Sequence, residues 1–309
     1  MNLLRISIVQ YLNTAPLVRG FTHGPLRGKY ELSFTVPSQC AEALRTGAAD
    51  VAIIPAIEYE RIPNLVVLPG LSIASNRTVR SLLLIARKPM PGVQRVALDR
   101  SSRSTQTLVR ILCDRHWQIT PEYFEADPDL PGMLQHADAA LLIGDPALKL
   151  SIATAETGSR EADGALVVPP SAAGLTGDVP VRIYDIVEQW RALTGRPAVM
   201  AMWAARKEVI TPGLVQDFQD SLAFGLRHLD AIANEAAVEL QLPAAELRRY
   251  LIENIDYRLD KEHRDALLVF YQLAARLRRI EAVKTIAFAA EAGGPVRYMD
   301  VISKGKAGH

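Results

Sequence analysis

Two short polar segments, each lying between an apolar run and a predicted helix, could bind a small anion. The first is Ser101–Thr105, which follows the strand-like run Val93–Asp99 and opens a helix predicted to reach about His116. The N–H groups and the dipole at a helix N-terminus favour a carboxylate or a phosphate. The alternative is that the hydroxyls only cap the helix. The residues expected to bind the anion are Ser102, Arg103, Ser104 and Thr105.

The second segment is Gln10–Thr14, between the predicted strand Leu4–Val9 and a predicted helix. Open α/β sheets bind ligands beside the carboxyl ends of their strands. Asn13 offers both a donor and an acceptor, and Thr14 offers a hydroxyl. We therefore expect Tyr11, Asn13 and Thr14 to contact a ligand, the alternative being that Asn13 or Thr14 only caps the helix.

Two further polar positions adjoin apolar strands. Gly144 and Asp145 end the run Ala139–Ile143, and Asp145 could either orient a substrate hydroxyl or cap the next helix. Ser81 begins the otherwise apolar run Ser81–Ile85, so its hydroxyl must find a partner or face a cavity. An ordinary strand serine bonded to the backbone is the alternative there.

Composition excludes several classes of protein. The 309 residues carry 35 Lys+Arg and 34 Asp+Glu, a net charge of +1, which argues against nucleic acid as a partner. No apolar stretch reaches the roughly 18 residues that span a bilayer, and the N-terminus lacks a signal-peptide pattern, so we expect a cytoplasmic protein without a membrane partner. Neither the histidines nor the distant Cys40 and Cys113 show metal-ligand spacing. We expect two buried thiols, no metal and no cofactor.

Helix and strand patterns alternate along the chain and predict an α/β fold in two lobes. The sequence Lys88–Gly92 contains two prolines and a glycine and predicts a linker. The strand predicted over Ala198–Ala204 and the helices after it are expected to return to the first lobe. We therefore predict one discontinuous lobe from residues 1–88 and 197–309 and an inserted lobe from residues 89–196. Two connections make a hinge, with a ligand cleft between the lobes.

Local signals set several element boundaries. Pro37 begins a helix that Gly47 ends, and Asp185 caps a helix that ends at Gly195. Residues 151–180 are rich in Ala, Gly, Ser and Pro and predict a long surface loop. From Thr211 onward the pattern is almost wholly helical, and the tail after Gly293 is expected to fray.

Many short blocks, in order over most of residues 4–275, resemble the menaquinone-biosynthesis family of the futalosine pathway. The resemblance implies the type-2 periplasmic-binding-protein fold, used as a cytoplasmic enzyme. Two departures are the length of residues 151–180 and the polar Gln106 and Thr107 where an apolar helix is typical. The blocks that carry it are Tyr11–Thr14, Val51–Pro55 with Glu58 and Tyr59, Pro69–Ser75, Val79–Ser81, Val96–Asp99 with Ser101–Arg103, Ala137–Leu148, Tyr184–Asp185 with Glu188–Trp190, and Trp203–Ala204 with Arg206.

Within that family, the blocks are most similar to the enzymes that remove water from chorismate. The resemblance implies a carbon–oxygen lyase that forms 3-[(1-carboxyvinyl)oxy]benzoate from a small dicarboxylate substrate, with no cofactor. It also implies that Asn13 and Ser81 lie at the substrate, as the catalytic residues. No strong base stands out in the matched loops, so our hypothesis is that the substrate's enolpyruvyl carboxylate takes the ring proton. A homodimer is left open.

Three other functions share these features. A small-anion solute-binding protein has the same fold but usually carries an export signal. A sibling lyase of the 1,4-dihydroxy-6-naphthoate synthase type uses the same scaffold for another substrate. A ligand-sensing regulatory domain would need an attached helix-turn-helix, for which we find no room before Leu4.

Overall fold

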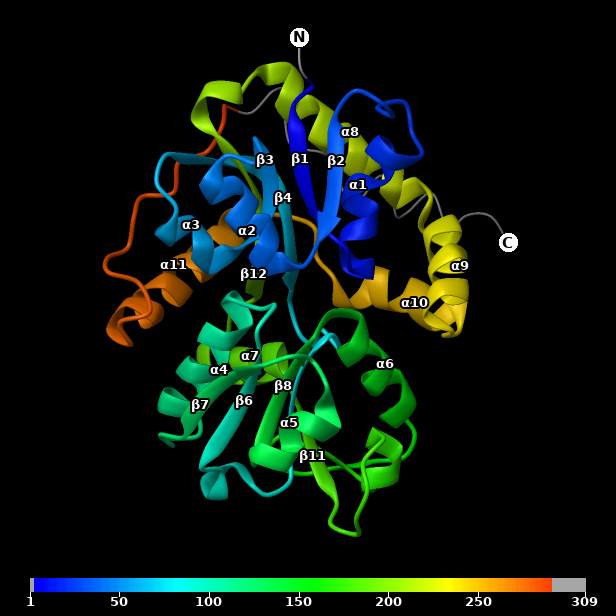
Figure 1. Cartoon of the computed structure of the whole chain (residues 1–309), viewed down its shortest axis with the longest axis vertical. Helices are drawn as coiled ribbons and strands as arrows, with labels where there is room; N and C mark the ends of the chain where they lie inside the picture. The colour runs from blue at the N-terminus through cyan, green and yellow to red at the C-terminus, as the bar shows by residue number, and fades with distance from the viewer. Residues whose placement is uncertain (1–2, 291–309) are drawn as a thin grey trace. The chain divides into compact units, whose positions relative to one another are not determined.

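The computed structural model describes residues 3–290 and divides the chain into two compact units (Figure 1). Among the described residues, the first takes in residues 3–74, 201–261 and 284–290, and the second takes in residues 75–200 and 262–283. The first crossover thus lies at residues 74–75 instead of the predicted 88–89, and residues 262–283 belong to the second unit instead of the first. The cause of the earlier crossover is strand β5 (Leu82–Ala86), which pairs with strands of the second sheet.

The first unit contains a five-stranded sheet of order β2-β1-β3-β12-β4. Strand β1 pairs in parallel with β2 and β3, whereas β12 pairs antiparallel with β3. Every residue of β3 is buried, as expected for a central strand covered on both faces. The strands are β1 (Arg5–Val9), β2 (Glu31–Thr35), β3 (Val51–Pro55), β4 (Leu65–Ser75) and β12 (Ala198–Arg206).

Two helices of the first unit, α1 and α8, lie against each other (Figure 1). A Cβ on Gly225 would lie 1.9 Å from the carbonyl oxygen of Pro16, so only glycine permits this approach. The Ser221 hydroxyl also donates to the Leu17 carbonyl at 2.8 Å. This contact fixes α1, which begins directly after the Gln10–Thr14 segment. The helices are α1 (Ala15–Thr22), α2 (Pro37–Thr46), α3 (Ala56–Arg61), α8 (Pro212–Arg227), α9 (Leu229–Leu240) and α10 (Ala244–Arg249), followed by a π-helical turn (Tyr250–Asn254).

The second unit contains a seven-stranded sheet of order β7-β6-β8-β5-β11-β10-β9. Strand β6 is parallel to β7 and β8, while β5 is antiparallel to both β8 and β11. The carboxyl ends of β6, β8 and β11 therefore lie at the same edge as the amino end of β5. The other strands are β6 (Arg95–Asp99), β7 (Glu122–Ala126), β8 (Ala139–Ile143), β9 (Ser159–Arg160), β10 (Leu166–Val168) and β11 (Val181–Asp185).

Helices of the second unit bury an apolar core against this sheet. Met133 and Leu134 of α5 pack with Leu83, Ile85 and other sheet residues. Helix α11 joins the unit through a ring contact between Phe270 and Trp190 of α7, with centroids 6.2 Å apart. The helices are α4 (Ser104–Arg115), α5 (Leu130–His136), α6 (Gly144–Thr154), α7 (Ile186–Thr194) and α11 (Lys261–Arg276).

Several local predictions are confirmed. Helix α2 begins at Pro37 and has Gly47 in the left-handed C-cap conformation, and Asp185 caps α7, which ends before a left-handed Gly195. Cys40 and Cys113 are free thiols and both are buried. Within residues 3–290, no helix is long and apolar enough to cross a membrane.

Residues 151–180 do not form the predicted long loop. Helix α6 continues to Thr154, β9 and β10 form an antiparallel pair, and a 3-10 turn spans Pro170–Ala173. Strand β11, which the sequence did not predict, gives β10 its other partner. A strand of three residues such as β10 has too little sequence pattern to be predicted locally. It forms by pairing with β11, which was not predicted either. The tail after Gly293 lies outside the described residues.

Candidate functional site

The predicted site residues of the second unit gather along one edge of its sheet. Ser81 precedes β5, Asp99 ends β6 and Gly144 follows β8, and these three strands are neighbours in the sheet. In the β5–β8 ladder, Leu82 stands opposite Ile143, which places Ser81 beside Gly144. We call this set the polar edge and define it as Ser81, residues 99–105, Gly144, Asp145 and Asp185.

A backbone hydrogen bond joins two of the predicted residues. The Gly144 N–H donates to the Ser81 carbonyl at 2.8 Å, and Ser81 is fully buried. Gly144 has a φ of 68°, a left-handed conformation that favours glycine, and it starts α6 directly from β8. Asp145 lies in the first turn of α6, while the N-cap position belongs to Ile143. A carboxylate in the first turn interacts favourably with the helix dipole.

Asp99 shapes the loop in front of α4. Its Oδ1 accepts hydrogen bonds from the Ser101 N–H at 2.9 Å and from the Ser101 hydroxyl at 2.6 Å. The Gln106 amide donates to the Asp99 carbonyl at 2.9 Å, which gives this departure from the family pattern a structural role. Among residues 3–290, Asp99 Oδ2 has no hydrogen-bond partner. Burial raises the pKa of the Asp99 carboxyl, although the hydrogen bonds from Ser101 oppose the rise.

The residues predicted to bind an anion lie at the start of α4. Arg103 occupies the N-cap position and its side chain makes no capping hydrogen bond, so capping by this residue is not observed. Ser102, Ser104 and Thr105 are all buried. The Arg103 guanidinium lies 3.4 Å from a carboxylate oxygen of Glu125 on β7, and both side chains are at least 40% exposed. An exposed ion pair of this kind contributes little to stability, so Arg103 can exchange partners at low cost.

In the first unit, the predicted residues form a tight turn. Leu12–Thr14 is a 3-10 turn directly after β1, and the Thr14 hydroxyl donates to Asn13 Oδ1 at 3.3 Å. Thr14 is the N-cap residue of α1 but makes no capping hydrogen bond with its side chain. Among the described residues, the half-buried Asn13 amide nitrogen has no hydrogen-bond partner and is therefore available to donate to a ligand. Tyr11 is also half-buried.

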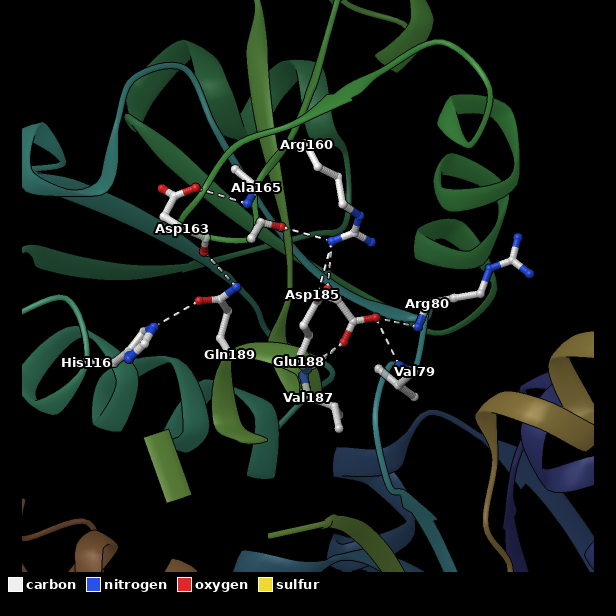
Figure 2. A network of polar contacts seen from close by, with 11 residues as sticks. Val79, Arg80, His116, Arg160, Asp163, Ala165, Asp185, Val187, Glu188 and Gln189 are labelled. Atoms are coloured by element: carbon white, nitrogen blue, oxygen red, sulfur yellow. Dashed lines mark hydrogen bonds and ion pairs between the residues drawn. The ribbon is translucent and has the colours of Figure 1, made fainter. Parts of the chain in front are cut away.

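Asp185 has a second set of partners that sequence reasoning missed. Its carboxylate accepts from Val187 and Glu188 at the start of α7 and also from the N–H groups of Val79 and Arg80, next to Ser81 (Figure 2). Burial raises the pKa of Asp185 to about 6, although these N–H donors oppose the rise. The sequence indicated its role as a helix cap, but not the contacts with Val79 and Arg80, because strand β11 before it was not predicted.

No metal-binding group is evident in the part of the chain that the structure describes. Residues 3–290 contain no cluster of three or more His, Cys, Asp or Glu side chains that could hold a metal ion. The polar edge and the turn at Asn13 instead present hydroxyls, an amide and helix N–H groups. These groups suit the recognition of carboxylates or hydroxyls.

Comparison with known proteins identifies relatives over nearly the whole chain. A family model described as menaquinone biosynthesis matches residues 4–276. A chorismate dehydratase from Thermus thermophilus is 29% identical over 269 residues, which are 86% of this chain and 93% of that protein. The residues matched by the family model belong to both compact units and include Asn13, Ser81 and Asp185.

Solved structures show the fold. A protein from Archaeoglobus fulgidus gives a TM-score of 0.66 at 16% identity, covering 90% of this chain and 98% of its own. The periplasmic aliphatic sulphonate binding protein of Escherichia coli gives a TM-score of 0.58 at 17% identity, covering 95% of this chain and 94% of its own. The chain therefore has the periplasmic-binding-protein fold, which confirms the fold class that the resemblance implied.

Proposed function

Because the chain belongs to the menaquinone biosynthesis family, we propose that it is a chorismate dehydratase, a hydro-lyase that converts chorismate into 3-[(1-carboxyvinyl)oxy]benzoate and water. The observation that carries the proposal is the relative of that name, which aligns with 86% of this chain at 29% identity. The proposal places the protein among cytoplasmic biosynthetic enzymes.

The chemistry needs little beyond positioning. The product keeps the enolpyruvyl ether and has lost the hydroxyl of the neighbouring ring carbon. The proton must therefore leave the carbon that bears the ether, while the C–O bond to the hydroxyl breaks and the ring becomes aromatic. The substrate's enolpyruvyl carboxylate is tethered to that same carbon, so it can accept the proton, which leaves with the hydroxide as water. A bound conformation that aligns these groups can supply several kcal/mol of the barrier.

The donors described above fit the polar groups of such a substrate. Chorismate carries two carboxylates, and the first turn of α4 with its buried hydroxyls suits one of them. The Asn13 amide nitrogen can donate to the departing hydroxyl or to a carboxylate oxygen. Ser81, at the head of β5, is assigned the second orienting role. Because the substrate's enolpyruvyl carboxylate accepts the proton in this proposal, these residues are needed only to bind and orient, and no strong base is required of the protein.

The direct test is to incubate the purified protein with chorismate and to follow the aromatic enolpyruvyl product by absorbance and mass spectrometry. Turnover is expected without added nucleotide. Recovery of unchanged, tightly bound chorismate would instead identify a binding protein, and failure to bind chorismate at all would favour the sibling lyase.

Site variants then separate the function from the residues that carry it. Asn13→Ala and Ser81→Ala should lower turnover while the far-ultraviolet circular dichroism spectrum is unchanged. Gln216→Ala and Ser159→Ala change an exposed amide and an exposed hydroxyl elsewhere, so they should keep the wild-type rate. Wild-type rates in both site variants would overturn the assignment of these two residues and leave the activity standing.

A further inference from the structure

Resting on the proposed function, we propose that Asp185 is a positioning residue, whose carboxylate clamps the backbone before Ser81 to the start of α7 and so holds the polar edge in its reactive arrangement. The carboxylate accepts hydrogen bonds on both oxygens. Oδ1 accepts from the Val187 N–H at 3.0 Å and the Glu188 N–H at 3.2 Å, which is ordinary N-capping. Oδ2 accepts from the Val79 N–H at 2.9 Å and the Arg80 N–H at 2.7 Å (Figure 2).

The backbone at Arg80 needs this second pair of hydrogen bonds. Arg80 has a φ of 61°, a left-handed conformation that costs a non-glycine residue roughly 1 kcal/mol or more. Consecutive N–H groups that converge beside a left-handed residue form a small anion-binding concavity. Here a carboxylate of the protein fills that concavity, so the conformation of residues 79–80 depends on Asp185.

The clamp connects directly to the predicted catalytic serine. Ser81 follows Arg80, and its carbonyl accepts the Gly144 N–H that starts α6. In the sheet, Asp185 stands opposite Leu83 of β5, and Leu82 stands opposite Ile143 of β8. A shift of residues 79–80 would therefore move both Ser81 and the α6 N-terminus. Misplacement of reacting groups by about 1 Å can cost on the order of 100-fold in rate.

The surroundings of Asp185 determine how the clamp responds to pH. From α7 it faces Glu188, which is itself paired with Arg160 at 3.0 Å. From the segment before β5 it contacts the backbone N–H of Arg80, whose side chain points away (Figure 2) and donates from Nε to Ser151 of α6 at 3.2 Å. From β5 it stands opposite the apolar Leu83. Since the clamp needs both oxygens as acceptors, protonation of Asp185 opens it. With its pKa raised to about 6 by burial, turnover is expected to fall as the pH drops through that value.

Two substitutions separate the clamp from the helix cap. Asp185→Asn keeps one acceptor oxygen and a good N-cap, but whichever way the amide turns, one pair of N–H groups then faces an NH₂ group. Asp185→Ser keeps the cap and is too short to reach Val79 and Arg80. Thr211→Ala is the matched control, because Thr211 caps α8 of the first unit by accepting from the Leu214 N–H at 3.1 Å.

The experiment measures kcat and KM for chorismate from pH 5 to 8, together with amide hydrogen exchange over residues 76–86. We expect both Asp185 variants to lose about 10- to 100-fold in kcat. KM should change little, exchange at residues 79–80 should become faster, and the fall in kcat near pH 6 should disappear. Thr211→Ala should lose stability but keep the wild-type kcat and pH profile. Adding Arg80→Gly to Asp185→Asn should recover part of the loss, because glycine adopts the left-handed conformation without strain.

The outcomes distinguish this inference from the proposed function. If the wild-type protein does not convert chorismate, the proposed function fails and the positioning role fails with it. If the wild type is active and stable Asp185 variants keep its kcat, the positioning role alone is wrong. Loss of stability equal to that of Thr211→Ala, with no change in kcat, exchange or pH profile, would reduce Asp185 to a helix cap.

Discussion

The turn at Asn13 and the polar edge differ in how firmly their own chain holds them. Asn13 is half-buried, and its amide makes one side-chain hydrogen bond, with the adjacent Thr14. In the polar edge, Asp99 and Asp185 each gather several N–H or O–H donors, and Ser81 is fully buried. The Asn13 amide can therefore still form hydrogen bonds with a ligand. The carboxylates of Asp99 and Asp185 mainly form hydrogen bonds within the protein. Substitutions should accordingly affect activity alone at Asn13, and both activity and stability at the buried Asp185 of the polar edge.

Asn13→Ala is expected to show the largest difference between its effect on kcat and its effect on stability. Loss of one donor that acts on developing charge typically lowers kcat by 10²–10³-fold, and we expect about that loss here. Since the amide supports little of the fold, the free energy of unfolding should change by no more than about 0.5 kcal/mol. Enzyme kinetics with chorismate and urea unfolding measure the two quantities. A large loss of stability in this variant would remove the distinction between the regions.

Asp185 of the polar edge should make the free energy of unfolding depend on pH. The pKa of Asp185 is raised from 3.8 to about 6, so the folded state holds its proton more tightly than the unfolded state does. The stability that this group contributes is present below about pH 4 and is lost as the pH rises through 6, by up to about 3 kcal/mol. Compared with wild type, Asp185→Asn should therefore gain relative stability between pH 4 and pH 7. A constant difference between the two unfolding free energies across this range would show that the pKa of Asp185 is not raised.

The turn at Asn13 leads directly into α1, and α1 is held in place by its contact with α8. Gly225→Ala tests how much this contact contributes to stability. The added methyl group would collide with the Pro16 carbonyl, so we expect a loss of about 1–3 kcal/mol in the free energy of unfolding. Gly213→Ala on the same helix is the control, because the nearest atom to its Cβ is 4.0 Å away. Equal stability of the two variants would mean that α1 and α8 can separate without cost.

The smallest effect is expected for Arg103→Ala. The exposed ion pair with Glu125 contributes at most about 1 kcal/mol, so stability should hardly change. If Arg103 binds a substrate carboxylate, KM should rise several-fold while kcat stays the same. Glu125→Gln removes the same ion pair and leaves Arg103 in place, and it should keep the wild-type KM. An unchanged KM in Arg103→Ala would remove this residue from the substrate-binding set.

The sequence allowed prediction of those features whose causes are local. Neighbouring residues were enough to predict the start of α2 at Pro37 and the cap of α7 by Asp185. They also predicted the buried strands β3 and β8. The first crossover was misplaced because β5 follows β4 closely in the chain but pairs with β8 and β11 in the other sheet. No periodicity within residues 82–86 distinguishes the two sheets.

The same limit applies to the candidate site. The Ser81, Ser101–Thr105 and Gly144 segments were each selected separately, whereas their convergence depends on the register of β5 against β8. The hydrogen bond between the Arg80 N–H and the Asp185 carboxylate joins two residues that are 105 positions apart in the chain. It also depends on the left-handed conformation of Arg80, which is unusual for a residue other than glycine. Long-range pairing and backbone strain of this kind leave no local pattern to read.

Strand β12 also has a consequence for protein synthesis. It lies between β3 and β4 in the first sheet, yet it is translated after every strand of the second sheet. A ribosome therefore releases the N-terminal apolar strands well before their shared neighbour exists, and the second sheet can be completed first. Until residue 206 has emerged, β3 and β4 lack the strand that joins them, so we expect their unpaired edges to be open to aggregation during this interval of translation.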